Sequence, residues 1–302
     1  MYVCGDYSSK YPLSGKVCII TGGTSGIGKE TVTLFVKEGA KVMFCGRGEE
    51  VGAAIADGLG PNCVFMRADV TVDEDIKAVM DQTIDRWGKL DCLFNNAGGG
   101  MGCDLEKMSK EMIGRTFDLN FNSMALATKY AIPHLRKQQH SSIINNSSVA
   151  AKRAGFGDAL YSAAKAAMDA FGRVAAMDLA KDGIRVNSIS PGATATPIFW
   201  SGSPGSQRGS KMSAEDNAIR QAKVEANIVN NVSPLRIGRS GTGYDIATAA
   251  LFLASDDSVW YTAQDMVVDG GITVFDAPNK GWMADEPRVD PVPLRHRPTA
   301  KL

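Results

Sequence analysis

The chain has 302 residues, in which 33 Lys and Arg balance 33 Asp and Glu, and hydrophobic residues make up 44% of the total. This composition is typical of a soluble globular protein, and the zero net charge disfavours the basic surface that nucleic-acid and anionic-membrane binders use. No apolar run approaches the roughly 20 residues that span a bilayer, and the first residues do not form a secretory signal. We therefore expect a cytoplasmic protein without a nucleic-acid or membrane partner.

The six cysteines and three histidines are scattered, with no C-x-x-C pair and no other metal-ligand spacing. Four of the cysteines lie in or beside apolar, strand-like runs: Cys18, Cys45, Cys63 and Cys92. We expect these four to be buried, reduced thiols, and we expect no metal site.

Short β-rich runs alternate with longer segments of helical period, which predicts a parallel sheet covered by helices on both faces. The expected strands are Lys16–Ile20, Lys41–Cys45, Cys63–Arg67, Leu90–Asn95, Ser142–Asn146, Arg185–Ser190 and Met266–Val268. We thus predict an α/β fold built on one doubly wound parallel sheet of seven strands. Because no linker separates two distinct halves, we expect one domain over residues 1–275, although the length alone allows two.

A glycine-rich turn follows the first expected strand and opens into a helix that is expected to begin near Lys29. Its glycines would allow a tight turn and close approach of the backbone to a pyrophosphate, which the helix N-terminus attracts. Turns use glycine for other reasons too, but the position between strand and helix favours a dinucleotide site. The candidate contacts are Gly22, Thr24, Ser25, Gly26, Ile27 and Gly28.

The second expected strand ends in Phe44-Cys45-Gly46-Arg47, where such a site meets the adenosine ribose. A carboxylate there would bind the ribose 2′-hydroxyl, whereas an arginine attracts a 2′-phosphate. Arg47 therefore favours NADP(H) over NAD(H). The alternative is a solvated arginine at a surface turn, neutralised by Glu49 and Glu50 nearby.

A crossover helix is predicted between the third and fourth strands. Thr71 and Glu74 have the spacing of a capping box. Apolar side chains then repeat on one helical face, namely Ile76, Val79, Met80, Ile84 and Trp87. We expect this helix to pack on the sheet and to have no part in the chemistry.

Two side chains suited to proton transfer lie in Tyr161-x-x-x-Lys165. Four residues apart on a helix, they project from the same face. A tyrosine is a poor acid or base at neutral pH because its pKa is about 10, but a neighbouring ammonium favours the phenolate and lowers that pKa. Ser148 comes just after the fifth strand, at the edge where parallel sheets assemble their sites. By itself the Ser147-Ser148 pair indicates a strand-end turn; with Tyr161 nearby, a serine there is a candidate to stabilise charge that develops on a substrate oxygen.

Five motifs stand in order along the chain: Thr21-Gly-x-x-x-Gly-x-Gly28, Asn95-Asn96-Ala97-Gly98, Ser148, Tyr161-x-x-x-Lys165 and Pro191-Gly192. In these motifs the sequence resembles the short-chain dehydrogenase/reductase family over about residues 13–274. The resemblance implies a Rossmann-type fold and a nicotinamide cofactor. It also implies hydride transfer coupled to proton transfer through Tyr161, which interconverts a secondary alcohol and a ketone.

The resemblance implies catalytic roles for single residues. It selects Ser148 over its neighbour Ser147, and it gives Lys165 a second role at the nicotinamide ribose hydroxyls. Asn120 would anchor a water that links Lys165 to bulk solvent as a proton relay.

Cofactor contacts are implied in the same way. Asp69 would accept a hydrogen bond from the adenine amine, Asn96 would lie against the adenosine ribose and stabilise the sheet, and Thr196 would hold the nicotinamide carboxamide. The further contacts implied are Val70, Ala97, Gly98, Tyr161, Lys165, Pro191, Gly192 and Thr194.

Residues 194–232 fall where the family places its substrate lid. Phe199 and Trp200 precede a Ser/Gly-rich run, Ser201–Ser210, which predicts a mobile loop, and Ser213 with Asp216 announces a helix. Two large rings beside a hinge favour an apolar, cyclic or aromatic substrate, although they could equally pack the lid onto the body. Further candidate pocket walls are Met101, Cys103 and Phe156.

The helix that bears Tyr161 is rich in alanine, and in the family such a helix builds a dimer interface, so we expect a homo-oligomer, either a dimer or a tetramer. Residues 276–302 hold five of the 12 prolines and Trp282, which predicts an extended tail. We expect this tail to cross a subunit boundary or to cover the mouth of the site.

These features together predict an NAD(P)-dependent oxidoreductase that acts on a small-molecule alcohol or ketone. Two other classes stay open. A non-catalytic NADP-binding sensor or scaffold of the same fold would lose Ser, Tyr or Lys of the motif, and all three are present. A sugar-nucleotide epimerase or dehydratase would need a larger C-terminal domain than residues 276–302 provide.

Overall fold

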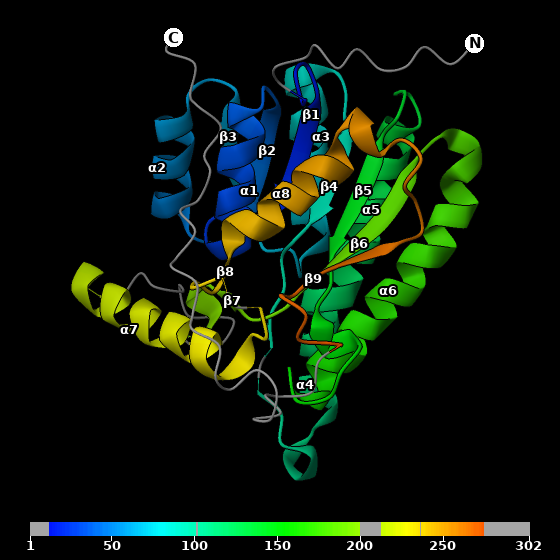
Figure 1. The fold of residues 1–302 in the computed structure, drawn as a ribbon. Coiled ribbons are helices and arrows are strands. Elements are labelled where there is room, and N and C mark those ends of the chain that lie inside the picture. The colour runs from blue at the N-terminus through cyan, green and yellow to red at the C-terminus, as the bar shows by residue number, and fades with distance from the viewer. Residues whose placement is uncertain (1–11, 101, 200–212, 236, 275–302) are drawn as a thin grey trace.

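The structure, a computed structural model, describes residues 12–100, 102–199, 213–235 and 237–274 (Figure 1). Within these residues, seven parallel strands form one sheet in the order β3-β2-β1-β4-β5-β6-β9. The strands are β1 (Val17–Thr21), β2 (Lys41–Gly46), β3 (Cys63–Arg67), β4 (Cys92–Asn95), β5 (Ser142–Asn146), β6 (Arg185–Pro191) and β9 (Asp265–Val268). The predicted doubly wound α/β fold is confirmed. Predictions for Met101, Trp200, 201–210 and 276–302 lie outside the described residues.

Helices cover both faces of the sheet because alternate side chains of each strand point to opposite faces. Cys18 and Ile20 pack in a core beneath one group of helices: α1 (Gly26–Lys37), α2 (Glu49–Leu59) and α8 (Gly243–Ala254). Ile19 packs on the other face, beneath α3 (Asp73–Trp87), α5 (Ser123–Leu135) and α6 (Ala159–Leu179). Two further helices, α4 (Lys110–Phe117) and α7 (Ala214–Asn227), lie beyond the carboxyl ends of the strands (Figure 1).

The strand order reverses beside β1, which pairs with β2 on one side and with β4 on the other. In doubly wound sheets the crevice outside the carboxyl ends of the strands at this point is the usual ligand site. The fold therefore predicts a ligand site formed by the turn after β1 and by the residues that follow β4, β5 and β6.

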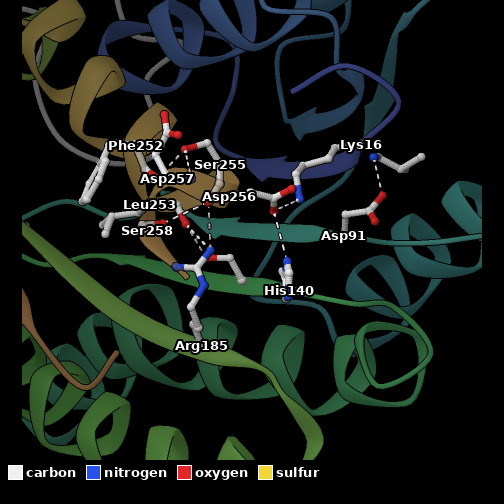
Figure 2. Close-up of polar contacts among 12 residues, drawn as sticks. Lys16, Asp91, His140, Arg185, Phe252, Leu253, Ser255, Asp256, Asp257 and Ser258 are labelled. Atoms are coloured by element: carbon white, nitrogen blue, oxygen red, sulfur yellow. Dashed lines mark hydrogen bonds and ion pairs between the residues drawn. The ribbon is translucent and has the colours of Figure 1, made fainter. Parts of the chain in front are cut away.

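At the amino ends of the strands, opposite this crevice, a buried arginine joins the sheet to a helix (Figure 2). Arg185, at the start of β6 and 5% exposed, donates from Nη2 to the carbonyl oxygens of Leu253 at 2.9 Å and Ser255 at 3.3 Å. The last carbonyls of a helix lack intrahelical partners and carry partial negative charge, so this guanidinium caps α8. Nearby, Lys16 forms an ion pair with Asp256 at 2.8 Å.

Two helix starts differ from the prediction. Thr71 does not cap α3, because its hydroxyl donates to the Asp69 carboxylate at 2.7 Å, and Val72 is the N-cap instead. The predicted capping box at Thr71 and Glu74 is therefore wrong. Helix α1 begins at Gly26, inside the glycine-rich turn and earlier than Lys29. The predicted cap at Ser213 is confirmed, since its hydroxyl accepts from the Asp216 amide at 3.0 Å.

A second, two-stranded sheet was not predicted: β7 (Thr194–Ala195) pairs with β8 (Gly241–Thr242) and joins the start of the expected lid to the start of α8. Strands of two residues leave no periodic pattern to detect. The prediction of buried, free thiols is confirmed for Cys18, Cys45, Cys63 and Cys92. None of the described helices has the length and hydropathy needed to cross a membrane.

Candidate active site

At two positions in the turn between β1 and α1, a Cβ would collide with backbone. Gly22 has a φ of +67°, and a Cβ there would lie 2.9 Å from the Cα of Ala97. A Cβ at Gly28 would overlap the carbonyl oxygen of Gly22. The sequence folds in this way because only residues without a side chain let the start of α1 come this close to the end of β1.

The N-terminus of α1 is left free to bind an anion. Ser25 is the N-cap, yet its side chain makes no capping hydrogen bond, and the first turn of this helix holds no acidic residue. The first amides of a helix lack intrahelical acceptors and carry partial positive charge. A pyrophosphate would satisfy these donors without meeting a negative side chain.

Asn96 fastens this turn to β4. Its Nδ2 donates to the carbonyl oxygens of Thr21 at 2.9 Å and Gly22 at 3.1 Å, while its Oδ1 accepts from Asn146 Nδ2 at 2.9 Å. The expected stabilising role of Asn96 at the centre of the sheet agrees with these contacts. Its side chain is fully engaged with protein, so the backbone of Ala97 and Gly98 forms the adjoining cavity wall.

One cavity of about 1220 Å³ lies along the carboxyl ends of the strands. It is lined by nearly all of the site residues expected from the sequence: Gly22, Thr24, Ser25, Gly26, Ile27, Gly28, Arg47, Asp69, Val70, Asn96, Ala97, Gly98, Ser148, Phe156, Tyr161, Lys165, Pro191, Gly192, Thr194, Thr196 and Phe199. Asn120 and the expected wall residue Cys103 do not line it, and Met101 and Trp200 lie outside the described part of the chain. The structure thus brings together residues from six loops.

Two arginines line the end of this cavity near β2 and β3. Arg47 follows β2, and Arg67 ends β3, where it is the register partner of Gly46. Within the described residues neither guanidinium forms an ion pair, so Arg47 is not paired with Glu49 or Glu50, the neighbours that the alternative interpretation had named. Arg67 was missed from the sequence, although its position at a strand end beside Arg47 could have indicated it.

The side chain of Asp69 is held at the same end. Its Oδ1 accepts from the amide and the hydroxyl of Thr71 at 3.0 and 2.7 Å, and its own amide donates to Asp75 at 2.8 Å. These contacts fix the carboxylate at the cavity wall. The Thr71 hydroxyl, which was expected to cap α3, instead orients the carboxylate of Asp69, a candidate contact of the cofactor.

Lys165 is buried beneath Tyr161. Its Nζ donates to the carbonyl oxygen of Asn146 at 2.6 Å and lies 5.6 Å from the centroid of the Tyr161 ring. Burial lowers the pKa of this ammonium from 10.5 to about 8, and the negative charge of Asp169, one helical turn later, partly opposes that shift. The cation expected beside the tyrosine is therefore present, and its proton is less tightly held than that of an exposed lysine.

Ser148 presents its hydroxyl at the end of β5. It caps a short 3-10 helix (Val149–Ala151), and its Oγ accepts from the amide of Ala150 at 3.1 Å. Because Oγ is the acceptor in this contact, the hydroxyl proton remains available for a substrate oxygen. The Ser147 hydroxyl donates to the carbonyl oxygen of Lys165 at 3.4 Å, a contact that holds α6 against β5.

Asn120 lies in a single π-helical turn, Asp118–Asn122, between α4 and α5. Its Oδ1 accepts from the Gly99 amide at 2.9 Å, and its Nδ2 donates to the carbonyl oxygens of Gly99 at 3.1 Å and Thr116 at 2.9 Å. The side chain is therefore held by backbone groups, and it does not line the cavity. A π-helical turn amounts to one extra residue in a helix, and such turns often occur at functional sites.

The remaining part of the cavity is bounded by apolar side chains. Phe156 comes from the loop before α6, and Ile198 and Phe199 come from the short helix Pro197–Phe199. Phe199 is 53% exposed and Ile198 is 37% exposed, so both rest largely outside the core. Ile198 was not expected from the sequence, because one isoleucine between a proline and a phenylalanine carries no distinctive pattern.

Comparison with known proteins agrees with these features. Residues 16–206 match the family profile described as short chain dehydrogenase, and residues 219–273 match one described as enoyl-(acyl carrier protein) reductase. The chain belongs to the short-chain dehydrogenase/reductase family. Members of this family are oxidoreductases that bind NAD(P)(H), and the glycine turn and the uncapped helix of this chain fit that cofactor.

The similar relatives extend over most of the chain. Momilactone A synthase of Oryza sativa subsp. japonica is 37% identical over 88% of this chain and 92% of its own length. A (+)-borneol dehydrogenase of Salvia officinalis is 35% identical over 86% of this chain and 90% of its own length. L-fucose dehydrogenase of Mus musculus is 34% identical over 85% of this chain and 88% of its own length. The chain is an NAD(P)-dependent oxidoreductase.

Proposed function

We propose that this dehydrogenase/reductase interconverts an apolar secondary alcohol and its ketone, with NADP(H) as the preferred cofactor. The observation that carries the proposal is the meeting of Tyr161, Lys165 and Ser148 with the glycine cradle in one cavity. When bound, the nicotinamide accepts or supplies the hydride. The protein's part is to orient the two molecules and to move one proton.

Tyr161 is the proposed acid and base. The buried Lys165 ammonium stabilises the phenolate, and the lowered pKa of Lys165 matches a site that exchanges protons near neutral pH. Ser148 donates its free hydroxyl proton to the substrate oxygen, where negative charge develops.

Proton exchange with solvent would pass along Lys165. One of its three N–H groups is used by the carbonyl oxygen of Asn146, which leaves donors for the ribose hydroxyls and for a water. The Asn120 side chain is fixed by Gly99 and Thr116, so Asn120 would hold this water through its backbone. The π-helical turn supports that role, since it frees carbonyl groups from the regular helical pattern.

The cofactor preference rests on the two arginines. Arg47 and Arg67 line one end of the cavity without an ion pair among the described residues, and a guanidinium pairs well with a phosphate. Asp69 would accept from the adenine amine, and Thr194 and Thr196, after Pro191-Gly192, would face the nicotinamide.

The apolar walls favour a substrate with little polar surface. Phe156, Ile198 and Phe199 supply no hydrogen bond, and the Asp158 carboxylate beside them is occupied by backbone amides. Borneol, the substrate named for one relative, is a bicyclic secondary alcohol of this kind. L-fucose, named for another, is a polar sugar and would leave its hydroxyl groups unpaired here.

A panel of alcohols with both cofactors tests this proposal. We expect oxidation of borneol and related cyclic alcohols with NADP⁺ to have a higher kcat/KM than oxidation of L-fucose, and NADP⁺ to be used in preference to NAD⁺. A preference for L-fucose would contradict the apolar substrate, and a preference for NAD⁺ would contradict the role of the arginines. NADPH binding with no turnover of any alcohol or ketone would favour the sensor or scaffold.

We also propose that the enzyme is a homo-oligomer that pairs through α6. Val174 and Met177 are 62% and 78% exposed and stand one turn apart on this alanine-rich helix, so they offer a second copy of the helix apolar contacts at close approach. Light scattering would give the mass in solution, and a monomer at assay concentration would contradict this proposal.

A further inference from the structure

A carboxylate beside the candidate base joins two parts of the active-site wall. Asp158 is the N-cap of α6, and its Oδ1 accepts from the Tyr161 amide at 2.9 Å. Its Oδ2 accepts from the Gly102 amide at 3.2 Å. A helix cap needs only the first contact, so the second makes Asp158 a bridge to the segment that follows β4.

This segment also lies near Tyr161. A Cβ at Gly100 would lie 3.2 Å from Asp158 Oδ2 and 3.8 Å from Cγ of Tyr161, so Gly100 faces the base of the Tyr161 side chain. On another side, a Cβ at Gly157 would come within 2.8 Å of Tyr161 Cδ1. The Tyr161 side chain therefore packs against two residues without side chains, Gly100 and Gly157.

The segment is anchored at both ends by residues of the site. Gly99 exchanges two hydrogen bonds with the side chain of Asn120, at 2.9 and 3.1 Å, and Gly102 is held by Asp158. Glycine is the most flexible residue, so a glycine-rich segment keeps one position only when contacts of this kind hold it.

We propose that Asp158 is a positioning residue for Tyr161, whose side chain it holds by fixing the wall residues Gly100 and Gly102 to the first turn of α6. The proposal rests on the proposed role of Tyr161 as acid and base. Loss of the bridge would leave α6 capped but would free the wall beside Tyr161. Proton transfer is sensitive to such displacement, whereas the apolar contacts of the substrate are made by other side chains, those of Phe156, Ile198 and Phe199, so kcat should fall while KM changes little.

Two substitutions separate the bridge from the cap. Serine and asparagine both cap helices well, so Asp158→Ser and Asp158→Asn can keep the contact with the Tyr161 amide. The serine side chain is too short to reach Gly102 as well. In asparagine the oxygen that faces the Tyr161 amide can stay, but the group that faces the Gly102 amide becomes Nδ2, which only donates and cannot accept that N–H.

Asp104→Ser is the matched control. Asp104 is also an aspartate that caps a short helix after β4, with Oδ1 accepting from the Glu106 amide at 3.2 Å, but it does not line the cavity. It therefore reports what the loss of an aspartate in this part of the chain does by itself.

Kinetics and hydrogen exchange test the proposal on the full chain. In both Asp158 variants we expect kcat to fall about 10- to 100-fold, with KM and the Kd of NADPH within about twofold of the unchanged protein. Mass spectrometry should show faster amide exchange in peptides that contain Gly102, and Asp104→Ser should show neither change. Either kcat within twofold in both variants or unchanged exchange would overturn the proposal.

The two proposals fail in different ways. If the unchanged chain turns over no alcohol or ketone, the proposed function fails, and the exchange of Gly102-containing peptides still decides whether Asp158 holds the wall. If the unchanged chain is active but the variants keep its kcat, only the role of Asp158 is overturned.

Discussion

At the scale of single residues, the site depends on a buried cation. Lys165 is 2% exposed, and removal from water costs an ammonium free energy that its hydrogen bond to Asn146 and the charge of Asp169 only partly offset. The protein keeps this costly group next to the Tyr161 ring, where a cation favours the phenolate. The buried charge therefore lowers the free energy of unfolding, and it stands at the point where a proton must move.

Lys165→Met should reveal this cost through pH. The folded-state pKa of about 8 lies below the unfolded value of 10.5, so below pH 8 both states are protonated and the full penalty is present. Between pH 8 and 10.5 the folded state loses its proton first, which relieves the penalty, so stability rises with pH. From pH 7 to pH 10 the unfolding free energy of the unchanged protein should gain about 2 kcal/mol relative to Lys165→Met.

Denaturant unfolding at the two pH values measures this difference. Lys37→Met, which removes an exposed lysine of α1, is the control and should show no comparable change. An equal difference in unfolding free energy between Lys165→Met and the unchanged protein at both pH values would show that Lys165 bears no such penalty.

At the scale of elements, the turn between β1 and α1 holds the cofactor end of the site together. Asn96 binds the carbonyl oxygens of this turn from β4, and Asn146 binds Asn96 from β5. Three adjacent strand ends are therefore linked through a single amide side chain. A change in this turn should therefore shift the ends of β4 and β5 as well, along the cavity that they line.

Gly28→Ala should disturb this element strongly. The new Cβ would overlap the carbonyl oxygen of Gly22, which is backbone and cannot move aside without opening the turn. We expect a loss of about 1 to 3 kcal/mol in unfolding free energy and an increase of at least about tenfold in the Kd of NADPH. Calorimetry and NADPH fluorescence measure the two effects.

Gly58→Ala is the matched control within another helix. A Cβ at Gly58 meets nothing within 4 Å, so this change should stabilise α2 by about 0.5 to 1 kcal/mol and leave NADPH binding unaltered. If Gly28→Ala behaved like Gly58→Ala, close approach of the backbone would not be required in the turn.

At the scale of the whole molecule, the sequence predicted the sheet well and some of the connections poorly. The seven strands were predictable because parallel strands are apolar runs bounded by turns, and the buried runs Ile19-Ile20 and Ile143-Ile144 are of this kind. The start of α3 was not predictable from capping patterns alone, because Thr71 binds Asp69 rather than the helix.

The candidate site could be predicted where its residues belong to motifs. Tyr161, Lys165 and the glycines have fixed spacings, and the structure brings them to one cavity. Asp158 was missed because its second partner, Gly102, lies on another loop, and only the fold brings the two together. Arg67 was missed although the end of a predicted strand beside that of Arg47 could have indicated it. Because the net charge of the chain is +0, the protein as a whole does not attract an anionic cofactor. That attraction must come from local groups, the N-terminus of α1 and the two arginines.

The proposal that Tyr161 exchanges the proton is tested most directly by the turnover of Tyr161→Phe. It is measured with the best alcohol of the panel, alongside the Kd of NADPH. Phenylalanine keeps the ring packed against Gly100 and Gly157 but removes the group that exchanges the proton. We predict that kcat falls by at least about 100-fold while the Kd of NADPH stays within about twofold. Activity within a few-fold of the unchanged protein would contradict the account.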